Sequence, residues 1–121
     1  MSSDLAVLVA DDELGMRETL VEIFADSGYA VRSVADGDSA LVEIRRNRFD
    51  VVVMDIRMPG RDGVAVLLES GAPPPPVILM TAYANDDQVR EAQASAFALL
   101  SKPFEVRHLL RLVADAAGVA A

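Results

Sequence analysis

Short apolar runs alternate along this chain with longer segments in which apolar positions recur every three or four residues. Runs of about four to six apolar residues, rich in β-branched side chains, are typical of strands buried on both faces of a sheet. Three clear runs and two less regular ones predict five strands, at Leu5–Ala10, Tyr29–Ala35, Val51–Met54, Val77–Met80 and Phe97–Leu100.

A segment with helical spacing of its apolar residues follows each predicted strand. The residues that define these helices are Met16, Leu20, Ile23 and Phe24; Ala40, Leu41 and Ile44; Val64 to Ser70; Val89 and Ala92; and Val106, Leu109, Leu110 and Val113. Gly28 is placed to end the first helix, and the alanine-rich tail after Asp115 is expected to fray. Strand and helix therefore alternate five times, which predicts an α/β fold with helices on both faces of a parallel sheet.

The composition fits one globular domain spanning residues 1–121. Hydrophobic residues make up 52% of the chain, which is enough to form a core. No apolar run approaches the ~20 residues of a membrane span, and the N-terminus lacks the plan of a secretory signal. The absence of cysteine excludes disulfides, thiolate metal sites and cysteine nucleophiles. We therefore expect a cytoplasmic protein that does not associate with membranes.

The charge balance narrows the class of partner. The formal net charge is −8 at pH 7, and such a surface repels a phosphate backbone. Direct binding to nucleic acid is therefore not expected. An acidic surface suits a basic protein partner or a divalent cation instead.

Polar residues collect where four of the predicted strands end. Asp11 and Asp12 follow the first strand, Asp55 ends the third, Thr81 ends the fourth, and Lys102 follows the fifth. The carboxyl ends of parallel strands share one edge of the sheet, where ligands bind in open α/β folds. Three carboxylates gathered there resist ionisation unless they are compensated. Mg²⁺, which prefers carboxylate and carbonyl oxygens, and the ammonium of Lys102 can both supply that compensation.

Each of these residues also has a purely structural interpretation. Asp55 can accept backbone hydrogen bonds from the next turn, Asp12 and Thr81 can cap helices, and Lys102 can be an exposed charge. Their coincidence on one edge favours a site. A carboxylate there can act as a nucleophile toward phosphorus, as in aspartyl-phosphate chemistry, while a hydroxyl and an ammonium hold the phosphoryl oxygens.

The motifs that contain these residues resemble those of response regulator receiver domains, which have the CheY-like, flavodoxin-type fold. The resemblance covers nearly the whole chain, and the motif sequences are most similar to those of receivers of the NtrC type. It implies a (βα)5 three-layer sandwich with a five-stranded parallel sheet in the order 2-1-3-4-5. The matching motifs are Asp11-Asp12, Met54-Asp55-Ile56-Arg57-Met58-Pro59-Gly60, Met80-Thr81-Ala82-Tyr83 and Lys102-Pro103-Phe104.

The resemblance implies a role for each residue of the site. Asp55 accepts a phosphoryl group from a histidine kinase and binds Mg²⁺ together with Asp12 and the backbone carbonyl of Arg57, while Asp11 acts mostly through water. Lys102 pairs with Asp55 and then with its phosphate, and Thr81 moves to bond the phosphoryl group. The Lys102–Pro103 bond is expected to be cis.

The implied function is a phosphorylation-dependent switch of two-component signalling and not a conventional enzyme. Its expected partners are a sensor histidine kinase or a phosphotransfer protein, and a downstream protein target or output domain. The fourth helix, fifth strand and fifth helix are expected to form the surface that binds a partner or a second copy of the chain, with Val89, Arg90, Gln93, Arg107 and Arg111 as candidate contacts.

Departures from the family pattern concern the switch. Leu99 stands where the family usually has an aromatic residue, so we expect Tyr83 and Thr81 to carry more of the signal than Leu99. The third helix is expected to be short because four prolines, Pro73–Pro76, follow it. Two alternatives stay open, a degenerate receiver that serves only as a docking module and a phosphohydrolase of the haloacid-dehalogenase kind. Arg57 opposes the second, since those enzymes carry an Asp two residues after the nucleophile.

Overall fold

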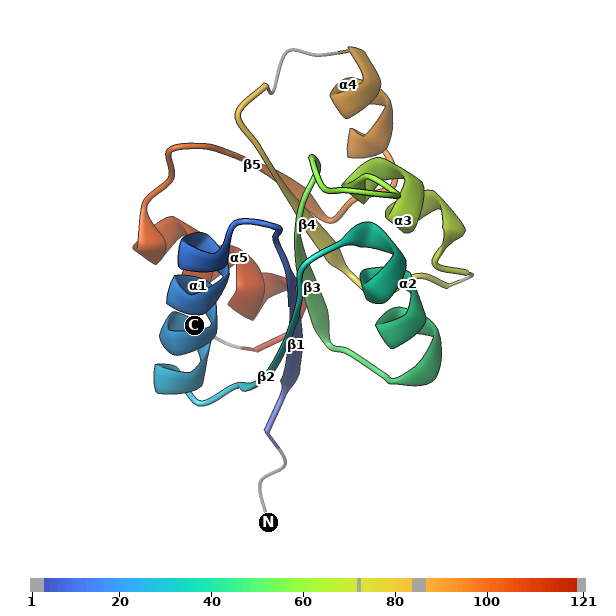
Figure 1. Cartoon of the computed structure of the whole chain (residues 1–121). Helices are drawn as coiled ribbons and strands as arrows, with labels where there is room; N and C mark the ends of the chain where they lie inside the picture. Colours follow the sequence, from blue (N-terminus) through green and yellow to red (C-terminus); the bar gives the residue numbers. More distant parts are fainter. Residues whose placement is uncertain (1–3, 72, 84–86, 120–121) are drawn as a thin grey trace.

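The computed structural model describes residues 4–71, 73–83 and 87–119 and shows one five-stranded sheet (Figure 1). All four neighbouring pairs of strands are parallel, and the strand order is β2-β1-β3-β4-β5. Both the parallel sheet and its 2-1-3-4-5 order are therefore confirmed. The strands are β1 (Ala6–Ala10), β2 (Ala30–Val34), β3 (Val51–Asp55), β4 (Val77–Thr81) and β5 (Ala98–Ser101).

Helices cover both faces of this sheet, as the alternation of strands and helices predicts. In Figure 1, α1 and α5 lie on one side of the strands, and α2, α3 and α4 lie on the other. The helices are α1 (Leu14–Asp26), α2 (Gly37–Arg46), α3 (Gly63–Glu69), α4 (Asp87–Gln93) and α5 (Val106–Ala116). None of the helices in the described part of the chain is long and apolar enough to cross a membrane.

The central strands separate two apolar cores. Successive side chains of a strand point to opposite faces, so Leu8 and Val52 join the core under α2, α3 and α4. Val7 and Val53 join the core under α1 and α5. Every residue of β3 and β4 is buried, which is why these segments read as continuous apolar runs in place of an alternating pattern.

Glycines close the ends of α1 and α5. Helix α5 ends at Ala116; Gly118 then adopts a φ of +74°, the Val119 N–H donates to the Ala114 carbonyl, and the Gly118 N–H donates to the Asp115 carbonyl. These two bonds are those of a Schellman motif, which satisfies carbonyls at the end of a helix. Gly28 ends α1 in the same way, with a φ of +93°.

Three apolar residues lie elsewhere than expected. Val89 of α4 is buried in the core, so its place among the candidate contacts of a docking surface is wrong. Val106 is exposed at the start of α5 although Leu109 and Val113 on the same helix are buried. Phe97 precedes β5 and its side chain is exposed. These side chains lie at or near the ends of their elements, where periodicity alone does not fix which residue packs inward.

Candidate functional site

The polar residues at the strand ends converge at the carboxyl edge of the sheet, the upper edge in Figure 1. The register of the strands explains this. Asp55 pairs with Met80 across β3 and β4, and Thr81 pairs with Ser101 across β4 and β5. Lys102 directly follows β5. It therefore lies one residue beyond Ser101, the residue that pairs with Thr81, in the direction of the carboxyl edge.

An ion pair joins two of these residues. The Lys102 Nζ donates a hydrogen bond of 2.9 Å to the Asp55 Oδ2, and the Arg57 backbone N–H donates one of 3.2 Å to the Asp55 Oδ1. Burial disfavours the ammonium of Lys102, but its hydrogen bond and charge attraction to Asp55, reinforced by Asp11, outweigh that cost and raise the pKa of Lys102 above its ordinary value. Both oxygens of Asp55 are therefore held in place by fixed donors.

Asp11 is the most buried carboxylate of the group. Its backbone N–H still belongs to the sheet, bonding the Val34 carbonyl at 3.1 Å, so the side chain turns inward and has no exposed surface. The Oδ1 accepts the Glu13 N–H at 2.9 Å, but the Oδ2 has no hydrogen-bond partner among the residues that the structure describes. Lys102 Nζ stands 3.9 Å from that oxygen. Burial, together with the negative charges of Asp55 and Asp12, raises the pKa of Asp11.

These residues together could hold a cation. One carboxylate oxygen from each of Asp11, Asp12 and Asp55 lies within 4.8 Å of the others. Asp12 is exposed while Asp11 and Asp55 are buried, so the group is open to solvent on one side. Oxygen ligands of this kind, with room for retained water, fit Mg²⁺. The Oδ2 of Asp11 is also consistent with a bound cation. A buried polar oxygen needs a partner, and the described protein groups do not supply one.

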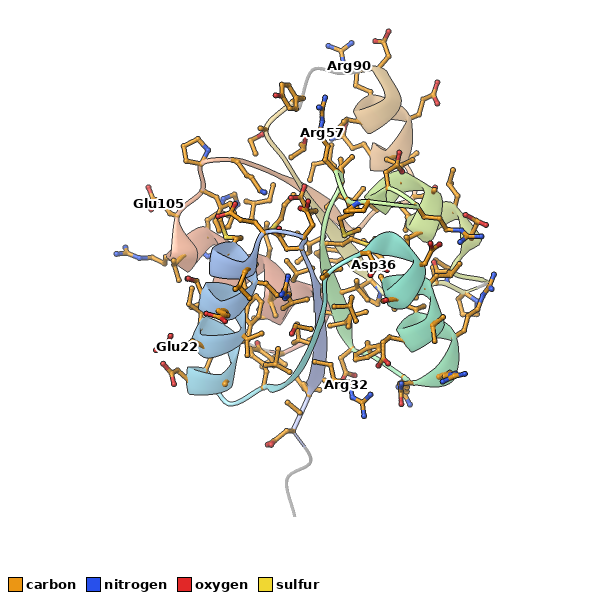
Figure 2. The ribbon with its side chains drawn as sticks, viewed as in Figure 1. Glu22, Arg32, Asp36, Arg57, Arg90 and Glu105 are labelled. Carbon is orange, nitrogen blue, oxygen red and sulfur yellow. The ribbon has the colours of Figure 1, made fainter. Side chains whose placement is uncertain are left out.

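The hydroxyl of the site is held by its own loop. Thr81 is buried, and its Oγ1 accepts the Tyr83 N–H at 2.9 Å. The Tyr83 ring in turn lies under the guanidinium of Arg57, whose Cζ is 4.1 Å from the ring centre. Figure 2 shows Arg57 above the carboxyl ends of the strands. An open pocket of about 550 Å³ lies here, and Asp12, Arg57, Thr81 and Tyr83 are among the residues that line it.

Close packing of two glycines fixes the loop after Asp55, a feature that the sequence reasoning did not single out. A Cβ on Gly63 would lie 2.6 Å from the Asp55 carbonyl oxygen, and a Cβ on Gly37 would lie 1.7 Å from the Arg61 carbonyl oxygen. Larger residues do not fit at such distances. The Asp62 side chain also caps α3 by accepting the Ala65 N–H at 2.8 Å. The signal that the sequence offers for this loop is the Asp62-Gly63 pair, which is typical of a turn.

Two further residues of the site hypothesis lie apart from the carboxylates. Leu99 is half-buried in β5 and packs against the core under α2, α3 and α4. It lines a groove that also includes His108 and not the pocket beside Tyr83. The Lys102–Pro103 peptide bond is cis, and Pro103 lies in the same groove as Leu99.

Comparison with known proteins identifies the family. The model of the response regulator receiver domain matches residues 7–114. The chain is 39% identical over 111 residues to the response regulator protein FleR of Pseudomonas aeruginosa, covering 89% of this chain and 24% of FleR. It is 34% identical over 103 residues to sporulation initiation phosphotransferase F of Bacillus subtilis, covering 83% of each.

A solved structure supports the same assignment. The receiver domain of the sensor histidine kinase PA1611 from Pseudomonas aeruginosa, described with magnesium coordinated in its active-site cleft, is 31% identical. Its TM-score is 0.82, and the match covers 96% of this chain and 99% of that one. The chain spans about a quarter of the length of FleR, at 24%, and most of the other two proteins. The chain therefore belongs to the family of response regulator receiver domains, which are phosphorylation-dependent switches of two-component signalling.

Proposed function

We propose that Asp55 is the residue that accepts the phosphoryl group in this chain. The observation that carries the proposal is the arrangement around its carboxylate. Lys102 Nζ lies 2.9 Å from the Oδ2, and the oxygens of Asp11 and Asp12 lie within 4.8 Å of an Asp55 oxygen. When a carboxylate attacks phosphorus, a cation beside it and a metal ion can offset the negative charges of the phosphoryl oxygens and of the carboxylate.

The proposed metal is Mg²⁺, held by Asp12, by Asp55 and by the backbone carbonyl of Arg57, with Asp11 acting through water. When bound, the ion would supply positive charge that offsets the charge on the phosphoryl oxygens. The unpartnered Oδ2 of Asp11 supports this assignment, since a water bound to the ion would give that oxygen a donor. The exposure of Asp12 leaves a route for the ion to enter.

The proposed reaction is a transfer to a carboxylate oxygen. An Asp55 oxygen attacks the phosphorus of the donor, a bond from that oxygen to phosphorus forms, and the bond from phosphorus to the leaving group breaks with its electron pair going to the leaving group. Lys102 and Thr81 hold phosphoryl oxygens, as ammonium and hydroxyl groups do in phosphoryl transfer. In the return step, water attacks the phosphorus, the bond from phosphorus to the Asp55 oxygen breaks, and inorganic phosphate leaves. The proposed chain thus promotes its own phosphorylation and dephosphorylation and does not turn over a separate substrate.

The proposed output is a change of surface near α4, β5 and α5. Thr81, with Tyr83, would respond to the phosphoryl group, and Leu99 would contribute less. Arg90, Gln93, Arg107 and Arg111 are exposed on α4 and α5 and remain candidate contacts for a downstream target, an output domain or a second copy. Residues 1–121 would act as one receiver domain whose phosphoryl donor is a histidine kinase or a phosphotransfer protein, in the cytoplasm.

The test is phosphorylation by acetyl phosphate in the presence of Mg²⁺, followed by intact mass. The wild type and the surface control Asp115→Asn should both gain the mass of one phosphoryl group, and Asp55→Asn should gain none. Asp115 suits as a control because its side chain is exposed on α5. Equal phosphorylation of Asp55→Asn would refute the assignment. A wild type that neither gains mass nor binds beryllofluoride would favour the docking-module alternative, and steady release of phosphate from a small ester would favour the phosphohydrolase.

A further inference from the structure

Two functional side chains of this pocket are held in the same way. The Asp55 carboxylate accepts the N–H of the residue two positions later, Arg57, at 3.2 Å. The Thr81 hydroxyl oxygen accepts the N–H of the residue two positions later, Tyr83, at 2.9 Å. Each bond closes a local turn in which a side chain satisfies a nearby backbone donor. The resting direction of each functional group is therefore tied to the backbone at position 57 or 83.

The two turns are joined to each other through side chains. The Arg57 guanidinium carbon lies 4.1 Å from the centre of the Tyr83 ring, well within the distance of about 6 Å at which a cation is attracted to a ring face. Arg57 belongs to the loop after β3 and Tyr83 to the loop after β4. One contact therefore links the loop of the carboxylate to the loop of the hydroxyl.

The linked residues also line a pocket that includes Thr81 and Asp12, and an oxygen of Asp12 lies within 4.8 Å of an Asp55 oxygen. The Thr81 Oγ1 accepts the Tyr83 N–H in this structure, while Asp55 is bonded by Lys102 and Arg57. The Thr81 O–H is still able to donate, but in the proposed function Thr81 moves toward the phosphoryl group. As its Oγ1 moves, the hydrogen bond from the Tyr83 N–H must lengthen or break unless the Tyr83 backbone moves with it. A Tyr83 ring fixed by Arg57 resists that movement, because the ring and the amide belong to one residue.

We propose that the Arg57–Tyr83 stack holds Thr81 in its resting hydrogen bond, so that these two positioning residues act as a brake on the active state of the receiver. The inference rests on the proposed function, because it takes the phosphoryl group to form on Asp55. Arg57 and Tyr83 are both exposed. A cation–π contact at an exposed site is weak, so the brake should change the resting-to-active ratio by about two- to fivefold and not by orders of magnitude.

The experiment measures the affinity of the Mg²⁺-bound protein for beryllofluoride, which mimics the phosphoryl group, by calorimetry. Tyrosine fluorescence is unsuitable because the chain has no Trp and two Tyr, one of which is changed. Arg57→Gln, which removes the cation, and Tyr83→Leu, which removes the ring, should each bind about two- to fivefold more tightly than wild type. Tyr83→Phe keeps the ring and should restore the wild-type affinity.

The double variant gives the decisive comparison. If the two side chains act as one stack, removing both should have no more effect than removing either, because each single change already breaks the contact. Additive effects would overturn the proposal and indicate two independent residues at the pocket mouth. Unchanged or weaker binding in both single variants would also overturn it.

Two matched controls separate this outcome from a failure of the proposed function. Arg46→Gln makes the same chemical change as Arg57→Gln, and Phe97→Leu likewise replaces an exposed aromatic ring by leucine. Both positions lie outside the pocket, and both variants should bind beryllofluoride as the wild type does. The NMR chemical shift of the Thr81 backbone amide during a beryllofluoride titration provides a second readout. Its change should be complete at a lower beryllofluoride concentration in Arg57→Gln and Tyr83→Leu than in the wild type. Failure of the wild type itself to bind beryllofluoride would refute the proposed function, whereas normal binding with equal affinity in all variants would refute the stack alone.

Discussion

Replacement of Asp11 by asparagine should stabilise the metal-free protein. The side chain is fully buried, and an asparagine Oδ1 can keep the bond that the Glu13 N–H donates at 2.9 Å. The substitution removes the negative charge of the carboxylate, whose Oδ2 finds no hydrogen-bond partner within residues 4–71, 73–83 and 87–119. The substitution therefore removes an electrostatic cost and keeps the local turn.

The magnitude follows from the charges around that oxygen. At an effective dielectric of about 20, the attraction from Lys102 Nζ at 3.9 Å is worth about 4 kcal/mol. One carboxylate oxygen of Asp11 and one of Asp55 lie no more than 4.8 Å apart. Their repulsion is about 3.5 kcal/mol or more, so it largely offsets the attraction from Lys102. The remaining cost is that of a buried polar atom without a partner, about 1–3 kcal/mol. Because the asparagine NH₂ stays polar, we expect a gain of about 1–2 kcal/mol, and roughly 3–6 °C in Tm for each kcal/mol.

The assay is thermal unfolding in EDTA at several pH values. Because the pKa of Asp11 in the folded protein is raised above its ordinary value of 3.8 by burial, the folded wild type binds this proton more tightly than the unfolded chain does. Its stability relative to the variant should therefore recover as the pH falls through that raised pKa. The advantage of Asp11→Asn should therefore be largest near neutral pH and shrink on acidification. Asp12→Asn, at an exposed and screened position, should change the stability by less than about 0.5 kcal/mol.

Millimolar Mg²⁺ provides the complementary measurement. Binding to the folded state alone should raise the Tm of the wild type by mass action, and both Asp11→Asn and Asp12→Asn should lose most of that response. If Asp11→Asn were no more stable than the wild type in EDTA, or if its gain did not depend on pH, the burial argument would fail. Equal gains for the two variants would show that burial does not distinguish the two carboxylates.

Three further outcomes are expected. Gly37→Ala should lose at least about 2 kcal/mol, measured by urea unfolding, because its Cβ would overlap the Arg61 carbonyl oxygen at 1.7 Å. Asp36→Ala should lower the free energy of unfolding by about 1 kcal/mol at pH 7, because it removes the N-cap of α2. The hydrogen bond from the Ser39 N–H lowers the pKa of Asp36 below its ordinary value of 3.8. The difference in stability should therefore persist down to about pH 3.8 and disappear as the pH falls through the lowered pKa. Thr81→Ala should reduce the beryllofluoride-induced NMR shifts across α4 more than Leu99→Ala does. The opposite ranking would show that Leu99 contributes more to the conformational change than Thr81.

The arrangement of the fold could be predicted because each strand carries its own signature. Val51–Met54 and Val77–Met80 are continuous apolar runs, and both lie in strands buried on both faces. The ends of the strands were predicted less closely than their positions. The second strand begins at Ala30 and ends at Val34, one residue inside each expected limit, because neighbouring exposed positions at an edge strand leave little contrast between strand and loop.

Sequence order by itself placed Asp55, Thr81 and Lys102 at one edge, since parallel strands joined through helices must all end on the same side of the sheet. The burial and the hydrogen-bond partners of each residue at that edge were decided by the tertiary structure alone. Asp11 and Asp12 look alike in the sequence, but the last sheet bond at the Asp11 amide turns the first side chain inward and leaves the second in solvent. The contact between Arg57 and Tyr83 could not be predicted from the sequence either. It depends on the distance in space between two loops, each closed by its own local hydrogen bond, and the order of residues along the chain does not determine that distance.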